Sequence, residues 1–119
     1  MQGKPPFRFV TAAPTVRVVS NTALGDSCYL VEWYRREVTA RPLDETVAKL
    51  DAGVEAIRAE GSAVQLLMAL TARSDQVLYS VFAASSPDAV RQACERAGFP
   101  VERLTAGIEI SHHMRAVSR

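Results

Sequence analysis

The chain is poor in the residues and motifs that mark a particular chemistry. Only two of its 119 residues are cysteine and two are histidine. Cys28 and Cys94 lie far apart and outside any C-x-x-C motif, which argues for reduced thiols and against a disulfide framework. The sequence also lacks a Gly-rich phosphate loop, a G-x-S-x-G elbow and an H-E-x-x-H motif. Nucleotide-dependent and nucleophilic enzymes therefore lose support.

Charge excess and long apolar runs are missing as well. Fourteen Lys and Arg residues against 13 Asp and Glu leave a net charge of +1, which gives no reason to expect a nucleic acid or an anionic membrane as partner. No apolar stretch approaches the roughly 20 residues that cross a bilayer, and the N-terminus has no apolar core of a signal peptide. We therefore expect a cytoplasmic protein with a single core.

The composition divides the chain into three parts. Residues 1–26 are an N-terminal arm with three prolines, and the β-branched cluster at 16–19 has residues enough for one added strand. Residues 27–115 show regular patterns and are expected to form the domain. Residues 116–119 are expected to be a frayed tail.

The first half of the domain predicts a strand, a helix and another strand. An aromatic and branched run at 28–35 is typical of a strand. A strand is also expected at 64–71. Between them, apolar residues recur at intervals of four and three, the spacing of one helix stripe that ends before Gly61. These apolar residues are Leu43, Val47, Leu50, Val54 and Ile57.

The second half repeats strand, helix and strand. The strand at 76–83 follows a short polar break and is expected to pair with 64–71 as an antiparallel hairpin. Ser86 and Pro87 supply the start of a helix that ends before Gly98. The alternating run 108–112 indicates the last strand. The order βαββαβ is that of a ferredoxin-like α+β fold, an antiparallel sheet covered by two helices on one face.

Side chains alternate between the two faces of a strand, so parity predicts which of them lie under the helices. The nearly all-apolar set is expected there, with Tyr29, Val31, Trp33, Val64, Leu66, Met68, Leu70, Val77, Tyr79, Val81, Ile108 and Ile110. The other face is expected to carry a mixed set, with Leu30, Glu32, Tyr34, Gln65, Leu67, Ala69, Leu78, Ser80, Phe82 and Glu109. That second face is too apolar to leave wet. We therefore expect a homodimer, a dimeric α/β barrel in which two such faces enclose a partly polar cavity.

Glu32 is the most unusual residue because its carboxylate stands inside an aromatic and aliphatic strand. Buried acids are rare unless they are paired or used. Glu32 is therefore either a general base or ligand contact in the cavity, or it pairs with an arginine across the interface. Tyr34, Gln65 and Ser80 complete the expected ligand-binding set. Tyr34 has packing as its alternative role.

The histidines, His112 and His113, raise the question of a metal. Neighbouring residues of a strand point to opposite faces, so the two cannot readily share one ion. His113 together with Glu109 would offer the imidazole and carboxylate ligands that divalent transition metals accept. The alternative is two exposed histidines near a frayed terminus.

Three stretches also carry a family resemblance: Tyr-Leu-Val-Glu at 29–32, Ser-Pro-Asp-Ala-Val-Arg at 86–91 and Ala-Gly-Phe-Pro-Val-Glu-Arg-Leu at 97–104. In these, and from residue 29 to about 110, the chain resembles a family of small bacterial proteins related to nickel-binding proteins and known as a domain of unknown function. The resemblance implies a ferredoxin-like subunit, a dimeric α/β barrel and, in some relatives, a nickel ion. The chain carries Met68 where that family often has a histidine, and a thioether is a weaker ligand for such an ion.

These observations predict a non-catalytic protein that holds a small ligand or a metal between the sheets of a homodimer. A first alternative is a cofactor-independent enzyme of the dimeric α/β-barrel kind, a monooxygenase or isomerase, with Glu32 or His113 as its acid–base group. A second alternative is a structural interaction module that docks through the arm.

Overall fold

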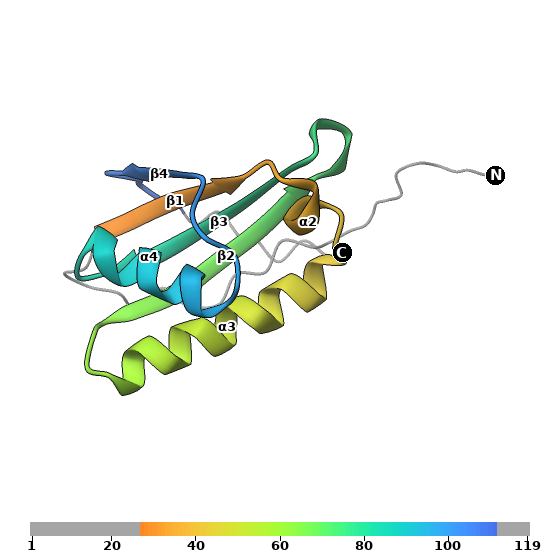
Figure 1. Cartoon of the computed structure of the whole chain (residues 1–119). Helices are drawn as coiled ribbons and strands as arrows, with labels where there is room; N and C mark the ends of the chain where they lie inside the picture. The colour runs from red at the N-terminus through yellow and green to blue at the C-terminus, as the bar shows by residue number, and fades with distance from the viewer. Residues whose placement is uncertain (1–26, 112–119) are drawn as a thin grey trace, which may run out of the picture.

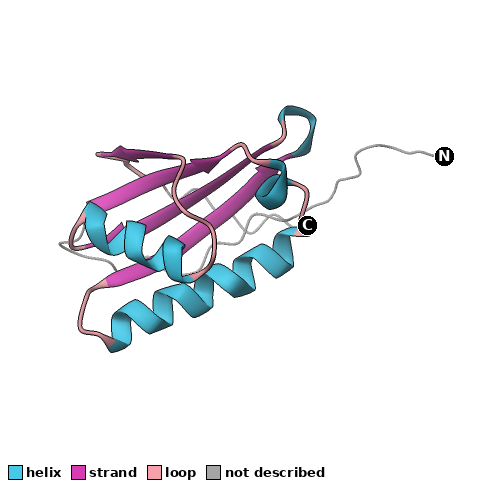
Figure 2. Cartoon of the chain, in the orientation of Figure 1, coloured by secondary structure: helices cyan, strands magenta, loops and turns pink. Residues whose placement is uncertain are grey.

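The computed structural model describes residues 27–111. Its elements are β1 (Ser27–Trp33), α2 (Arg36–Thr39), α3 (Leu43–Ala59), β2 (Val64–Ala72), the 3-10 turn η1 (Arg73–Asp75), β3 (Val77–Ala84), α4 (Pro87–Arg96) and β4 (Arg103–Ala106). The four strands form one antiparallel sheet in the order β2-β3-β1-β4. Figures 1 and 2 show α3 and α4 side by side on one face of that sheet. The predicted ferredoxin-like α+β fold is confirmed. The arm at 1–26 and the tail at 116–119 lie outside the described residues.

The two long helices begin where the sequence predicts. At the start of α4, the Ser86 hydroxyl accepts a hydrogen bond from the Ala89 amide at 3.2 Å, and Pro87 occupies the first turn. Asp44 and Glu45 lie in the first turn of α3, where negative side chains interact favourably with the helix dipole and stabilise the helix. The connection before α3 contains the short helix α2, which the sequence does not predict. None of the described helices is long and apolar enough to span a membrane.

The strand β1 alternates as predicted. Tyr29, Val31 and Trp33 are buried in the core beneath the helices, with 6%, 0% and 0% of their surface exposed. Leu30 and Glu32 are half-buried and lie between them in the strand, so they belong to the other side of the sheet. We call the side that carries Leu30 and Glu32 the open face.

The predicted faces of β3 are wrong. Val31 pairs with Ser80, and residues directly opposite one another in an antiparallel pair share a face. Leu78, Ser80 and Phe82 therefore lie under the helices, while Tyr79 and its alternate neighbours lie on the open face. Both faces of β3 are apolar enough for either assignment, so the pairing alone decides between them.

The strand β2 changes face at a β-bulge. The register shifts between Leu66 and Met68, which leaves Leu67 as an extra residue. Before the bulge the predicted faces are right, and Leu66 is in the core beneath the helices. Beyond it Ala69 takes the core position, while Leu67 and Met68 join the apolar cluster on the open face. Leu70, also predicted to lie under the helices, is 38% exposed.

The last strand is β4 and not the predicted run 108–112. Leu104 of β4 stands opposite Val31 and packs against the core. The strand ends before Gly107, whose φ of 73° lies in the left-handed region that favours glycine. Residues 108–111 are outside any strand. The Ile108 amide still donates to the Cys28 carbonyl at 3.2 Å, so the chain continues beside the start of β1.

The chain after β4 covers part of the open face. An apolar cluster there contains the buried Leu67, Val81 and Ala83. Packed against it are Cys28, Leu30, Met68, Ile108 and Ile110. The two isoleucines were predicted to lie under the helices, and that prediction is wrong. The covered part is the end at which β1 begins. The end at which β1 finishes holds the exposed large side chains, Leu70 and Tyr34.

The two cysteines are free. Cys94 is buried in the core, and burial raises the pKa of its thiol to about 12. Such a thiol stays protonated and inert at neutral pH, as the sequence predicts. Cys28 is half-buried on the open face.

Gly53 determines how closely α3 approaches α4. A Cβ at this position would lie 2.2 Å from the Ala93 carbonyl oxygen and 3.1 Å from the Ala97 nitrogen, both of which are backbone atoms. Gly53→Ala should therefore lower the free energy of unfolding by ~1–3 kcal/mol through overpacking, although alanine is the better helix former. Denaturant unfolding measures the change. The exposed neighbour offers a control, since Ala52→Gly should cost only about 1 kcal/mol of helix propensity. A Gly53→Ala variant more stable than the parent would contradict this contact.

Ser80 is fully buried, and its hydroxyl has no hydrogen-bond partner among the residues that the structure describes. Because an unpaired buried hydroxyl costs ~1–3 kcal/mol, Ser80→Ala should raise the free energy of unfolding by about 1 kcal/mol. Thr46 is the matched control, being equally buried but with its hydroxyl 3.4 Å from the Pro42 carbonyl oxygen. Thr46→Val should lower stability. Both changes are read from urea midpoints, and a destabilised Ser80→Ala variant would mean that the hydroxyl is bonded after all.

Candidate functional site

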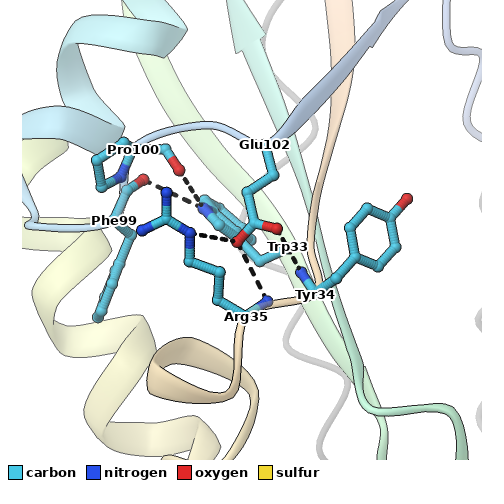
Figure 3. Close-up of polar contacts among 6 residues, drawn as sticks. All are labelled: Trp33, Tyr34, Arg35, Phe99, Pro100 and Glu102. Atoms are coloured by element: carbon cyan, nitrogen blue, oxygen red, sulfur yellow. Dashed lines mark hydrogen bonds and ion pairs between the residues drawn. The ribbon is translucent and has the colours of Figure 1, made fainter.

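Trp33 fixes the end of β1. Its indole is fully buried, and its Nε1 donates hydrogen bonds to the carbonyl oxygens of Phe99 at 3.1 Å and Pro100 at 3.0 Å (Figure 3). The Phe99 ring meets the indole edge-on, with ring centroids 6.5 Å apart and an angle of 71° between the planes. The loop that follows α4 is thereby held against the end of β1.

Glu102 holds the backbone just beyond β1. Its Oε1 accepts a hydrogen bond from the Tyr34 amide at 3.0 Å, and its Oε2 accepts one from the Arg35 amide at 3.2 Å (Figure 3). The Arg35 Nε also lies 3.5 Å from Oε2, and only 17% of the Glu102 side chain is exposed. These contacts give partners to two amides at the point where the sheet ladder ends. They also place β4 directly beside β1.

Glu32, Tyr34 and Arg103 form a polar group on the open face, which we call the Glu32 cluster. The Tyr34 hydroxyl donates to Glu32 Oε1 at 2.5 Å. Arg103 stands opposite Glu32 in the register between β1 and β4, and its Nε lies 3.7 Å from Glu32 Oε2. The Glu32 side chain is 14% exposed, against 64% for Arg103. A carboxylate set in an apolar surface is thus paired and held within its own chain.

The neighbouring carboxylate changes the titration of Tyr34. The pKa of Tyr34 is raised above its usual 10.0, chiefly because the neutral phenol donates the hydrogen bond to Glu32. Desolvation and the negative charge of Glu32 act in the same direction, and Arg103 acts against them. The phenol therefore remains a hydrogen-bond donor throughout the physiological range.

The structure brings together only two of the four predicted ligand-binding residues. Glu32 and Tyr34 lie in the cluster. Ser80 lies on the helix side of the sheet, because the face predicted for its strand is wrong. Gln65 is on the open face but in register, through β3, with Cys28. Cys28 is four positions along β1 from Glu32, which corresponds to about 13 Å at ~3.3 Å per residue.

Of the two predicted metal ligands, one lies within the described residues. Glu109 is exposed in the segment after β4, and His113 lies outside the described part. Between residues 27 and 111, no group of three or more His, Cys, Asp or Glu side chains could hold a metal ion. The described part of the chain therefore does not by itself supply a complete ligand set.

Two neighbours of Glu32 are not found by the sequence reasoning. Arg103 belongs to β4, whereas the sequence predicts the last strand at 108–112. It does lie in the stretch 97–104 that carries the family resemblance. Tyr79 stands opposite Glu32 on β3 and was assigned to the helix side. One of the two alternatives for Glu32 was an arginine partner from a second chain. The structure supplies one from the same chain.

No family model matches the chain, and no curated protein matches it. The crystal structure of SCO4226 from Streptomyces coelicolor A3(2) is similar, with a TM-score of 0.55 and 18% sequence identity, over 71% of this chain and 99% of that chain. A likeness at this identity supports the ferredoxin-like fold and nothing about activity. The relation to nickel-binding proteins stays a prediction.

Glu32→Gln should lower the pKa of Tyr34 toward 10.0, because the acceptor weakens and its charge is lost. Because the pKa of Tyr34 is raised in the folded state, its hydrogen bond to Glu32 adds to the free energy of unfolding. This contribution is complete below the usual tyrosine pKa and is lost as the pH rises through the raised value. Absorbance titration of the tyrosinates follows the shift, with Tyr34→Phe identifying which of the three tyrosines is responsible. Glu109→Gln removes the same charge elsewhere and should change nothing. An unshifted Tyr34 in Glu32→Gln would show that the bond is absent in solution.

Proposed function

We propose that the protein is a non-catalytic binding protein that acts as a homodimer and holds a small ligand between two open faces, beside the Glu32 cluster. The observation that carries this proposal is the Glu32 carboxylate, 14% exposed and held by two side chains of its own chain on a largely apolar sheet face. A polar group fixed before the ligand arrives loses little freedom on binding. Such a group is suited to recognition.

The partner expected for the open face is a second copy of this chain. Residues 107–111 cover one end of the face, while Leu70 and Tyr34 at the other end are 38% and 45% exposed. Tyr79 is half-buried between them and opposite Glu32. A two-fold axis through this end would cover the same apolar residues of both chains. It would also bring the two Glu32 clusters to the same enclosed space.

The side chains of the cluster indicate the kind of ligand. A carboxylate has about four acceptor sites, so Glu32 can accept from a ligand in addition to Tyr34 and Arg103. Arg103 is 64% exposed and has donors left for a carbonyl or acidic group. A small molecule with an apolar body and both a donor and an acceptor fits these groups.

Binding is favoured over catalysis at this site. Both carboxylate oxygens of Glu32 are already in contact with Tyr34 or Arg103, so a general base at Glu32 would first have to break these contacts. We place the protein in the cytoplasm, in keeping with its two free cysteines. Nickel remains the ion that the family resemblance implies, with Glu109 and His113 as its proposed ligands.

Sedimentation velocity at micromolar concentration should show a dimer, and Leu70→Lys should convert it to a monomer because the lysine would be buried without a partner. Ala52→Lys adds the same charge on the exposed side of α3 and should leave the dimer intact.

Native mass spectrometry of the dimer should then find a bound small molecule that Glu32→Gln loses. A parent protein that sediments as a monomer contradicts the proposed assembly. Nickel titration of the parent and of His113→Ala tests the metal version, which fails if no stoichiometric ion binds.

A further inference from the structure

A pocket lies between α2 and the turn that joins β2 to β3. It has a volume of about 140 Å³ and is lined by Arg36, Thr39, Ala40, Arg73 and Gln76. Figure 1 shows how α2, after the end of β1, comes close to the end of the β2–β3 hairpin. The pocket shares no residue with the Glu32 cluster, so it is a separate site.

The two arginines of this pocket have no acidic partner among residues 27–111. Arg36 and Arg73 are both exposed, and neither guanidinium takes part in a described ion pair. The acids of the same two segments, Glu37 and Asp75, do not pair with them within the described part either. Two arginines that have no ion pair in the described part of the chain therefore line one small pocket.

The arginines on either side of α2 behave differently. Arg35 pairs with Glu102. Arg41 pairs with Glu45 at 2.9 Å and also donates to the Glu37 carbonyl. These two guanidinium groups stabilise the fold. Arg36 and Arg73, in contrast to these two, take part in no ion pair within residues 27–111.

Backbone hydrogen bonds hold both segments that line the pocket, α2 and the turn η1. The Ala40 amide donates to the Arg36 carbonyl at 3.0 Å, which closes α2. The Gln76 amide donates to the Arg73 carbonyl at 3.1 Å, and Gln76 adopts a φ of 55°, in the left-handed region that few residues other than glycine enter. The four-residue turn therefore holds Arg73 and Gln76 on the same side of the pocket.

We propose that this pocket binds a phosphate group. Two guanidinium groups match its charge of about −1.5 to −2 near neutral pH, and each can donate two parallel hydrogen bonds to its oxygens. The Thr39 hydroxyl and the side-chain amide of Gln76 add neutral donors. A carboxylate, with a single charge, would leave one arginine uncompensated.

The size of the pocket agrees with this ligand. Pockets that enclose drug-sized molecules measure roughly 300–1,000 Å³, so 140 Å³ suits a compact anion. The phosphate group would be inside, and the rest of a phosphorylated small molecule would remain in solvent. Inorganic phosphate and a phosphomonoester offer the same chemistry to the two arginines.

Amide NMR titrations of the full chain with inorganic phosphate, and separately with glycerol phosphate, test the proposal at constant ionic strength and neutral pH. We expect saturable shifts of the amides of Arg36, Thr39 and residues 73–76, with millimolar affinity. Tighter binding of glycerol phosphate would assign the site to phosphomonoesters, and equal binding would assign it to phosphate itself. Arg36→Gln and Arg73→Gln should each weaken binding on the order of tenfold or more.

Arg58→Gln and Arg91→Gln are the matched controls, because both arginines are exposed on α3 and α4 and neither lines the pocket. They should bind phosphate as the parent does. The proposal is overturned if no saturable shift appears, if acetate at the same ionic strength gives the same response, or if the double variant Arg36→Gln/Arg73→Gln binds unchanged. The sedimentation and Glu32→Gln experiments report on the open face alone, so the two sites are judged separately.

Discussion

The buried indole of Trp33 makes the contact on which the position of the Glu32 cluster depends. By bonding to the carbonyls of Phe99 and Pro100, it holds the loop after α4 against β1, and β4 follows that loop directly. This position gives the register in which Arg103 stands opposite Glu32. A shift by one residue would turn Arg103 toward the apolar core, where an unpaired guanidinium is costly. The Glu32 cluster is thus a consequence of core packing on the other side of the sheet.

The sequence predicts the faces of an element correctly where one side is clearly more apolar than the other. In β1 the buried Tyr29, Val31 and Trp33 alternate with half-buried residues that include Glu32, and the periodic stripe of α3 is equally one-sided. In β3 both faces are apolar, so alternation holds no information about which face the helices cover. The pairing of Val31 with Ser80 decides it, and that pairing is a long-range contact.

The bulge in β2 and the position of β4 are long-range as well. Nothing in the run 64–71 marks Leu67 as an extra residue, since the bulge exists only relative to β3. The strand β4 has only four residues, whereas the run from Ile108 has the stronger alternation but follows Gly107, whose φ of 73° is not that of a strand. The sequence therefore places Glu32 and Tyr34 on the same face of the sheet, as the structure does. It places Ser80 on the wrong face, because a different strand positions that residue.

The core and the proposed phosphate pocket lie in different parts of this fold. The close approach of α3 and α4 at Gly53 lets both helices share one face of the sheet, and this arrangement supplies the main core. The turn η1 has no buried residue, and α2 buries only Val38. Segments that contribute so little to the core can present Arg36 and Arg73 in solvent, where salt screens their repulsion. An anion between them would remove that repulsion, so a ligand there would stabilise two segments that add little to the core.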